Sequence, residues 1–140
     1  MLTIAGADLA AVIEHCRREL PDEACGILGG RGGRVESVHP VKSVRASPSR
    51  YAMDPAEQFR ALDDIRRAGR ELAGIYHSHP DGPAGMSDVD REQALWPGTS
   101  LPSYPEAVQV VVSLQDRLAP QVRGYALAAG SFREVPIVVC

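Results

Sequence analysis

Two histidines and a serine–aspartate pair stand close together in the middle of the chain. His77 and His79 flank a single residue, and Ser87 and Asp90 follow shortly after them. Side chains alternate faces along a strand, so imidazoles two residues apart point the same way if this segment is extended. Neutral imidazole is a good ligand for zinc. The pair is therefore a candidate metal site that needs a further ligand.

Asp90 is the candidate third ligand because it lies one turn into the helix that we expect to begin after Ser87. The two residues are three apart, so they share a helix face near its N-terminus. Segment 81–86 contains Gly82, Pro83 and Gly85, and it is long enough to fold this helix back over the end of the strand. Two histidines and one carboxylate leave a fourth position open, as catalytic zinc sites require. Zinc there would lower the pKa of water towards ~7 and polarise a carbonyl.

Such a site also needs a general base, and Glu23 is the candidate. It stands at the start of an expected strand, directly after the first expected helix. A carboxylate within hydrogen-bond reach of the reacting water is able to take its proton.

Taken together, these motifs resemble those of the JAMM (MPN+, Mov34/PAD-1-like) zinc metalloproteases. The sequence is similar to the minimal bacterial members of that family, which lack large insertions, and it shows no departure at the motif positions. The matching segments are Pro21-x-Glu23-x-Cys25-Gly26-x-Leu28-x-Gly30, His77-Ser78-His79-Pro80 and Ser87-x-x-Asp90.

The resemblance implies a separate role for each of five residues. His77, His79 and Asp90 would bind one zinc ion per chain, the one cofactor expected. Glu23 would take a proton from the attacking water and pass it to the leaving amine, and Ser87 would steady the water or the oxyanion. The implied substrate is the C-terminal tail of a ubiquitin-like or sulfur-carrier protein, cut at a peptide or isopeptide bond.

Apolar periodicity and turn residues give the elements that must position this site. Strands and helices are intermixed, which predicts an α/β or α+β sandwich with a mixed sheet. The resemblance implies the same architecture, an MPN-type fold similar to that of cytidine deaminases. The expected helices are Gly6–Leu20, a second from Pro55 to near Gly69 with Asp54 as its cap, and a third from Ser87 to Pro97. The expected strands are Leu2–Ala5, Glu23–Gly30, Arg34–Val44, Glu71–His79, Ala107–Leu114, Gln121–Ala128 and Phe132–Val139.

Four finer expectations accompany these elements. The second helix should bury an apolar side formed by Ala56, Phe59, Leu62 and Ile65. The nearly all-apolar strand Ala107–Leu114 should lie inside the sheet rather than at its edge. Loops 45–54 and 97–105 are placed to shape a substrate groove, and a substrate tail could add as a strand to an exposed sheet edge.

Length and composition exclude several classes of protein. The chain has 140 residues, which suits one domain over residues 1–140. A net charge of -3 argues against a nucleic-acid partner. No apolar run approaches the ~20 residues that a membrane helix needs, and without a targeting signal the expected compartment is the cytoplasm. The oligomeric state stays open, since Val135–Val139 fits either a core strand or an interface.

Single residues also have simpler interpretations. Ser87-x-x-Asp90 fits a helix capping box, which is compatible with ligation because a cap also fixes the carboxylate. Cys25 is expected to be a small buried residue, and Cys16, Cys25 and Cys140 form neither a disulfide framework nor a zinc motif. We expect His15 and His39 not to be ligands, and Trp96 to be a packing anchor.

Three other functions remain as alternatives. A scaffold of the same fold would lack the metal, although every ligand residue is present here. A non-haem iron enzyme also uses two histidines and a carboxylate, but it would leave Glu23 and Ser87 without roles. A zinc deaminase would need a Pro-Cys-x-x-Cys segment, which this sequence lacks.

Overall fold

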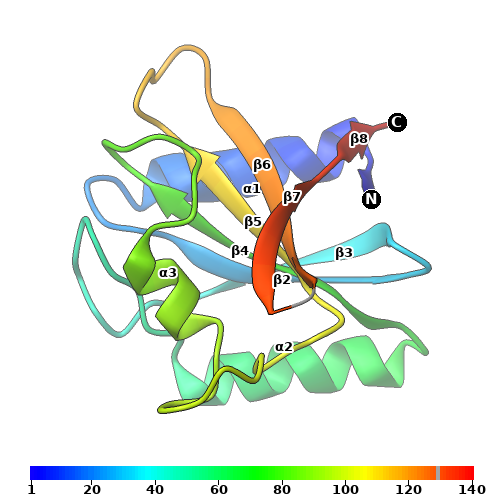
Figure 1. Ribbon diagram of the computed structural model, residues 1–140. Helices are drawn as coiled ribbons and strands as arrows, with labels where there is room; N and C mark the ends of the chain where they lie inside the picture. Colours follow the sequence, from blue (N-terminus) through cyan, green and yellow to red (C-terminus); the bar gives the residue numbers. More distant parts are fainter. Residues whose placement is uncertain (129) are drawn as a thin grey trace.

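The computed structural model describes residues 1–128 and 130–140. Within these residues, eight strands form one mixed sheet in the order β7-β6-β5-β4-β2-β3-β1-β8, with helices α1 and α2 running along it (Figure 1). The prediction of a mixed sheet packed against helices is confirmed. The helices are α1 (Gly6–Arg18), α2 (Pro55–Arg67) and α3 (Asp88–Gln93). The strands are β1 (Leu2–Ile4), β2 (Cys25–Arg31), β3 (Arg34–Val41), β4 (Glu71–His79), β5 (Val108–Ser113), β6 (Gln121–Ala128), β7 (Ser131–Val135) and β8 (Ile137–Val139).

The sheet separates two apolar clusters, because successive side chains on a strand point to opposite faces. On one face, Leu28 and Tyr76 pack with α1 residues such as Val12 and Cys16. On the other face, Cys25 and Ile27 pack with α2 residues. On β4, Tyr76 therefore faces α1, and the next residue, His77, faces the side of the sheet that α2 covers.

A buried polar pair fixes β4 against α1. The Tyr76 hydroxyl lies 2.7 Å from Nδ1 of His15, and both side chains are buried. Burial lowers the pKa of His15 more than the nearby Glu19 carboxylate raises it, so this imidazole is neutral at pH 7. His15 thus has a packing role, as the sequence predicts.

The two ends of the sheet approach each other. β8 pairs in parallel with β1 at one end, and the side chain of Ile137 on β8 packs over Gly124 on β6 near the other end. Figure 1 shows β7 running directly into β8 as one red ribbon. The single strand predicted over Phe132–Val139 is therefore wrong. Proline has no N–H for a ladder, and Pro136 separates two strands that pair with different neighbours.

Most local predictions are confirmed. β4 has the predicted bounds, and β5 pairs with a strand on each side. Asp54 caps α2 by accepting a hydrogen bond from the Glu57 N–H at 3.0 Å. Gly32 and Gly33 join β2 to β3 with φ of 56° and 77°, a region that glycine enters without a steric penalty.

The predictions for two helices hold only in part. On α2, Ile65 is buried and Leu62 packs against the core as predicted, whereas Ala56 and Phe59 are exposed, Phe59 to 72 %. Ala61 and Ile65 are the buried residues of this helix; they are four apart and define the stripe that meets the sheet. α3 ends at Gln93 rather than at Pro97, because Leu95 and Pro102 form a β-bridge that takes the chain out of the helix. No helix in the described part of the chain is long and apolar enough to cross a bilayer.

Gly26 leaves room for the ring of Tyr76 in the core. A Cβ at Gly26 would lie 2.2 Å from the ring of Tyr76, and this ring is fully buried against His15. We expect Gly26→Ala to lower the free energy of unfolding by about 3 kcal/mol, as overpacking of a tight core does. Urea unfolding measures this loss. Gly85→Ala is the matched control, since nothing lies within 4 Å of a Cβ there. Equal stability of the two variants would contradict the prediction.

Candidate metal centre

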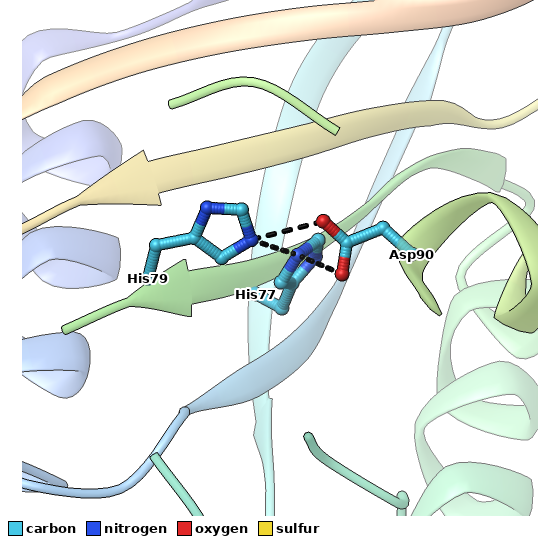
Figure 2. Close-up of side chains that lie close together, drawn as sticks. All are labelled: His77, His79 and Asp90. Atoms are coloured by element: carbon cyan, nitrogen blue, oxygen red, sulfur yellow. Dashed lines mark hydrogen bonds and ion pairs between the residues drawn. The ribbon is translucent and has the colours of Figure 1, made fainter. Parts of the chain in front are cut away.

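His77, His79 and Asp90 converge as the sequence predicts. Each offers one ligand atom, and these atoms all lie within 4.8 Å of one another. Figure 2 shows the two rings from the end of β4 meeting the carboxylate that α3 brings over them. The Nε2 atoms of the two histidines are 3.2 Å apart. Asp90 Oδ1 lies 3.1 Å from Nε2 of His77, and Oδ2 lies 2.9 Å from Nε2 of His79.

Sheet register places the two histidines. His77 pairs with Cys25 of β2 and Val111 of β5, and His79 pairs with Ser113 of β5. β4 is thus held on both sides as far as His77, and on the β5 side up to its last residue, His79. This pairing fixes the direction of both imidazoles at the point where the chain leaves the sheet.

A capping box places Asp90. The Ser87 N–H donates to Asp90 Oδ2 at 2.9 Å, and the Asp90 N–H donates to Ser87 Oγ at 3.1 Å. Both interactions satisfy donors at the N-terminus of α3 that would otherwise lack a partner. The capping interpretation is therefore confirmed, and the cap also orients the carboxylate towards the histidines.

The hydrogen bond from His79 to a backbone carbonyl defines its tautomer. Nδ1 of His79 lies 2.7 Å from the carbonyl oxygen of Pro83, and a carbonyl oxygen only accepts, so this nitrogen carries the proton. In the neutral ring, Nε2 then presents a lone pair towards Asp90 Oδ2, which is also an acceptor. Two acceptors at 2.9 Å repel unless a cation lies between them. Either a proton on Nε2 or a metal ion satisfies this requirement.

The spacing of the donor atoms fits a tetrahedral metal. Zinc ligands at 2.0–2.1 Å stand about 3.3 Å apart from one another, close to the 2.9–3.2 Å observed here. The side chains of His77 and Asp90 are 2 % and 3 % exposed, and that of His79 is 12 % exposed. The cluster is therefore enclosed by protein and opens to solvent on the His79 side.

The surrounding charges hold Asp90 ionised. Burial raises the pKa of its carboxyl, but the hydrogen bonds with His77 and His79 outweigh burial and take the pKa well below its ordinary value. For His79, burial lowers the pKa, and the interactions with Asp90 and the Pro83 carbonyl raise it to a net increase. An anionic carboxylate beside two imidazoles is a donor set suited to a divalent transition metal.

Glu23 lies beside this cluster but is not part of it. Its N–H donates to the Ser47 carbonyl at 2.8 Å, and the next N–H, of Ala24, donates to Ser78 Oγ at 2.8 Å. Its side chain is buried, and Oε1 has no hydrogen-bond partner. Burial raises the pKa of Glu23 to about 7, and the charges of His79 and Asp90 act on it in opposite directions. A carboxyl with a pKa near neutrality suits proton transfer.

Two features of the site were not predicted. The ring of Tyr51 stacks on His77, with centroids 5.1 Å apart and planes 25° apart, and the Pro83 carbonyl binds His79. A tyrosine in a polar loop carries no motif, and a backbone carbonyl has no sequence signature. Hydrophobic character in an otherwise polar loop was the one available signal for Tyr51.

A groove of about 970 Å³ extends from Tyr51 along the same face of the sheet. Loop segments 51–53 and 95–104 contribute to its walls, in agreement with the two loops that the sequence singled out. Ile75 in its floor is two residues before His77 on β4, so the groove ends beside the candidate metal ligands. Trp96 lines the groove and is 56 % exposed. Its prediction as a packing anchor is wrong, because α3 stops before it.

The remaining candidates have structural roles. Nε2 of His39 bonds to Ser37 Oγ at 2.9 Å, away from the cluster. Cys25 is fully buried, and burial raises the pKa of its thiol to about 12, so the thiol stays protonated and unreactive. All three cysteines are free.

Comparison with known proteins gives concordant matches. Residues 7–123 match the family described as prokaryotic homologs of the JAB domain. The chain is 38 % identical to the desampylase of Haloferax volcanii over 104 residues, 69 % of this chain and 75 % of that protein. It is 35 % identical to the CysO-cysteine peptidase of Mycobacterium tuberculosis over 136 residues, 95 % and 88 % of the two chains. A solution structure from Desulfitobacterium hafniense superposes with a TM-score of 0.84 at 32 % identity, covering 100 % of this chain and 93 % of the other.

Burial of Glu23 should make the stability of the metal-free protein depend on pH. Its pKa rises from 4.5 to about 7 on folding, so the folded state binds the proton more tightly. The contribution to stability is therefore favourable at low pH and is lost as pH rises from 4.5 to 7. We expect metal-free Glu23→Gln to be more stable than wild type by about 1–3 kcal/mol at pH 8, and close to wild type at pH 4.

Urea unfolding across this pH range measures the difference. Glu14→Gln, which removes an exposed carboxylate from α1, is the control and should change little at either pH. A constant difference between Glu23→Gln and wild type from pH 4 to pH 8 would mean that burial of Glu23 does not couple to its charge.

Proposed function

The chain belongs to the family of prokaryotic homologs of the JAB domain, and on that basis we propose that it is a zinc-dependent peptidase. We infer that it cleaves a peptide or isopeptide bond at the C-terminal tail of a ubiquitin-like or sulfur-carrier protein. The family and the reaction class match what the motifs implied, since relatives are named as a peptidase and a desampylase. The zinc, the residue roles and the substrate of this chain are part of the proposal.

One observation supports the proposal above the others. The lone pair of His79 Nε2 and a carboxylate oxygen of Asp90 face each other at 2.9 Å, with Nε2 of His77 beside them at 3.2 Å. Without a metal, the site avoids this repulsion only by holding a proton on Nε2 of His79. Zinc satisfies all three donors and leaves a fourth position for substrate or water.

Each residue then has a distinct task. His77, His79 and Asp90 would hold the ion. Zinc at this position would act as a Lewis acid on the scissile carbonyl and lower the pKa of water. Glu23, with a pKa of about 7 and an unpartnered oxygen, would accept a proton from the attacking water and deliver it to the leaving amine. Ser87 Oγ accepts from the Asp90 N–H, so its own O–H remains a donor for the developing oxyanion.

The groove suits an extended peptide that leads to the metal ligands. It is lined largely by apolar and uncharged polar side chains, which fits a flexible tail better than a charged ligand. Tyr51 joins the groove to the site, because it lines the groove and stacks on His77. Gln93 of α3 donates to the Tyr51 carbonyl at 2.8 Å and fixes the loop in this position. We infer that the substrate tail lies between Tyr51 and Trp96.

Metal content and turnover should separate in two variants. Wild type purified without chelator or affinity metal is expected to contain about one zinc per chain. Glu23→Gln should keep this zinc and lose about 10²–10⁴-fold in kcat, since only the base is removed. Asp90→Ala should lose both the zinc and the activity. Elemental analysis and cleavage of a carrier protein extended by one C-terminal residue are the measurements.

Glu14→Gln serves as the control and should match wild type in both respects. Full activity of Glu23→Gln would exclude Glu23 as the base. Stoichiometric zinc in Asp90→Ala would exclude that carboxylate as a ligand. A folded wild type that refuses zinc would indicate a scaffold, and bound iron with oxygen-dependent turnover would indicate the iron alternative.

Loss of the Trp96 side chain should weaken substrate binding without slowing the catalytic step. Trp96→Ala removes a large apolar wall of the groove, and we expect KM for the carrier protein to rise about tenfold with little change in kcat. Leu118→Ala is the control, because Leu118 is 94 % exposed and lies outside the groove. Steady-state kinetics distinguish the two variants. An unchanged KM in Trp96→Ala would remove Trp96 from the substrate path.

A further inference from the structure

Segment 80–86 joins the two elements that carry the candidate ligands, since it runs from His79 at the end of β4 to Ser87, which caps α3 and is followed by Asp90. A loop of this length with two glycines has a large conformational entropy when free. The loop must nevertheless hold the Pro83 carbonyl 2.7 Å from Nδ1 of His79. Something outside the loop must therefore restrict it.

Side chains of β5, β6 and their connecting turn provide this restriction. The Ser113 hydroxyl donates to the Gly82 carbonyl at 2.6 Å, and the Tyr125 hydroxyl donates to the Ala84 carbonyl at 2.8 Å. Arg117 donates to the Pro80 carbonyl and, at 3.2 Å, to the Asp81 carboxylate. Three side chains outside the loop thus bind three of its carbonyls.

Two of these bound carbonyls, those of Gly82 and Ala84, lie on either side of the Pro83 carbonyl that binds His79. Gly82 and Ala84 are the neighbours of Pro83, so the two hydroxyls fix the peptide units on either side of the carbonyl that binds His79. Ser113 is placed by the β4–β5 ladder, where it pairs with His79 itself. Tyr125 comes from the next strand, β6, and reaches across to the same loop.

We propose that Ser113 and Tyr125, with Arg117, are positioning residues that set the metal affinity of the site. They act through the loop: by fixing the Pro83 carbonyl they keep the proton of His79 on Nδ1 and its lone pair on Nε2, and they hold α3 where Asp90 meets the histidines. Partners one step beyond the ligands commonly tune metal binding in this way. The inference rests on the proposed zinc site.

Two isosteric substitutions test it. Ser113→Ala and Tyr125→Phe each delete one hydroxyl and leave the shape of the side chain nearly unchanged. We expect each to weaken zinc binding and the double variant to weaken it by about 10- to 100-fold, measured by competition with a chromophoric chelator. Hydrogen exchange in metal-free protein should show faster exchange in segment 80–86 of the same variants.

The controls remove similar hydroxyls elsewhere. Ser37→Ala breaks a hydrogen bond to His39 on β3, and Tyr76→Phe breaks one to His15 on the opposite face of the sheet. Tyr76→Phe should lower thermal stability and leave the zinc affinity at the wild-type value. A loss of zinc affinity in Tyr76→Phe equal to that in the double variant would reduce Ser113 and Tyr125 to a general structural role and overturn the inference.

The outcomes separate this inference from the proposed function. If wild type binds zinc tightly and the double variant binds it equally well, the positioning role is wrong and the proposed function stands. If wild type binds no zinc, the proposed function fails, and the inference fails with it. Faster loop exchange with an unchanged dissociation constant also overturns the inference, because the loop would then be held without influencing the metal.

Discussion

The arrangement of the site depends on one electrostatic constraint, the meeting of electron-pair donors inside a cluster that is almost closed to water. His79 Nε2, His77 Nε2 and the carboxylate of Asp90 lie 2.9–3.2 Å apart, and the Pro83 carbonyl commits the proton of His79 to the opposite side of its ring. Such a cluster is stable only with positive charge at its centre. The fold must therefore supply enough favourable packing and hydrogen bonding elsewhere to keep these donors together.

The sheet supplies that rigidity through its two faces. Tyr76 and Ser78 point to the α1 side, where one bonds to His15 and the other to the backbone of Ala24. Their burial anchors the intervening His77 on the other face. The absence of a side chain at Gly26 allows the Tyr76 ring to take its position. Packing on the α1 face of β4 thus helps to position the candidate ligands on the other face.

The convergence of the three candidate ligands could be predicted from the sequence because its signals are local. Alternation along β4 and the three-residue spacing of Ser87 and Asp90 depend only on neighbours in the chain, and both were confirmed. Phe59 and Trp96 were misplaced because their environments depend on where α2 meets the sheet and where α3 stops, which are tertiary events. The support of the Pro83 carbonyl by strands β5 and β6 was not foreseen, since hydroxyl-to-carbonyl contacts over long separations leave no pattern in the sequence.

The candidate metal site is rigid and the groove beside it is open to solvent. Both lie along the same face of the sheet. At the metal end, β4 pairs on both sides and the following loop is bound by side chains from β5 and β6. At the groove end, the walls are loops that leave Trp96 and Leu101 largely exposed, and apolar side chains exposed beside a groove favour a partner that covers them. Tyr51 stands where the two ends meet, because it stacks on His77 and also forms part of the groove. A tail seated in the groove would therefore contact Tyr51, whose ring stacks on the candidate ligand His77. Substrate binding and the geometry of the proposed metal site would then be coupled through this one side chain.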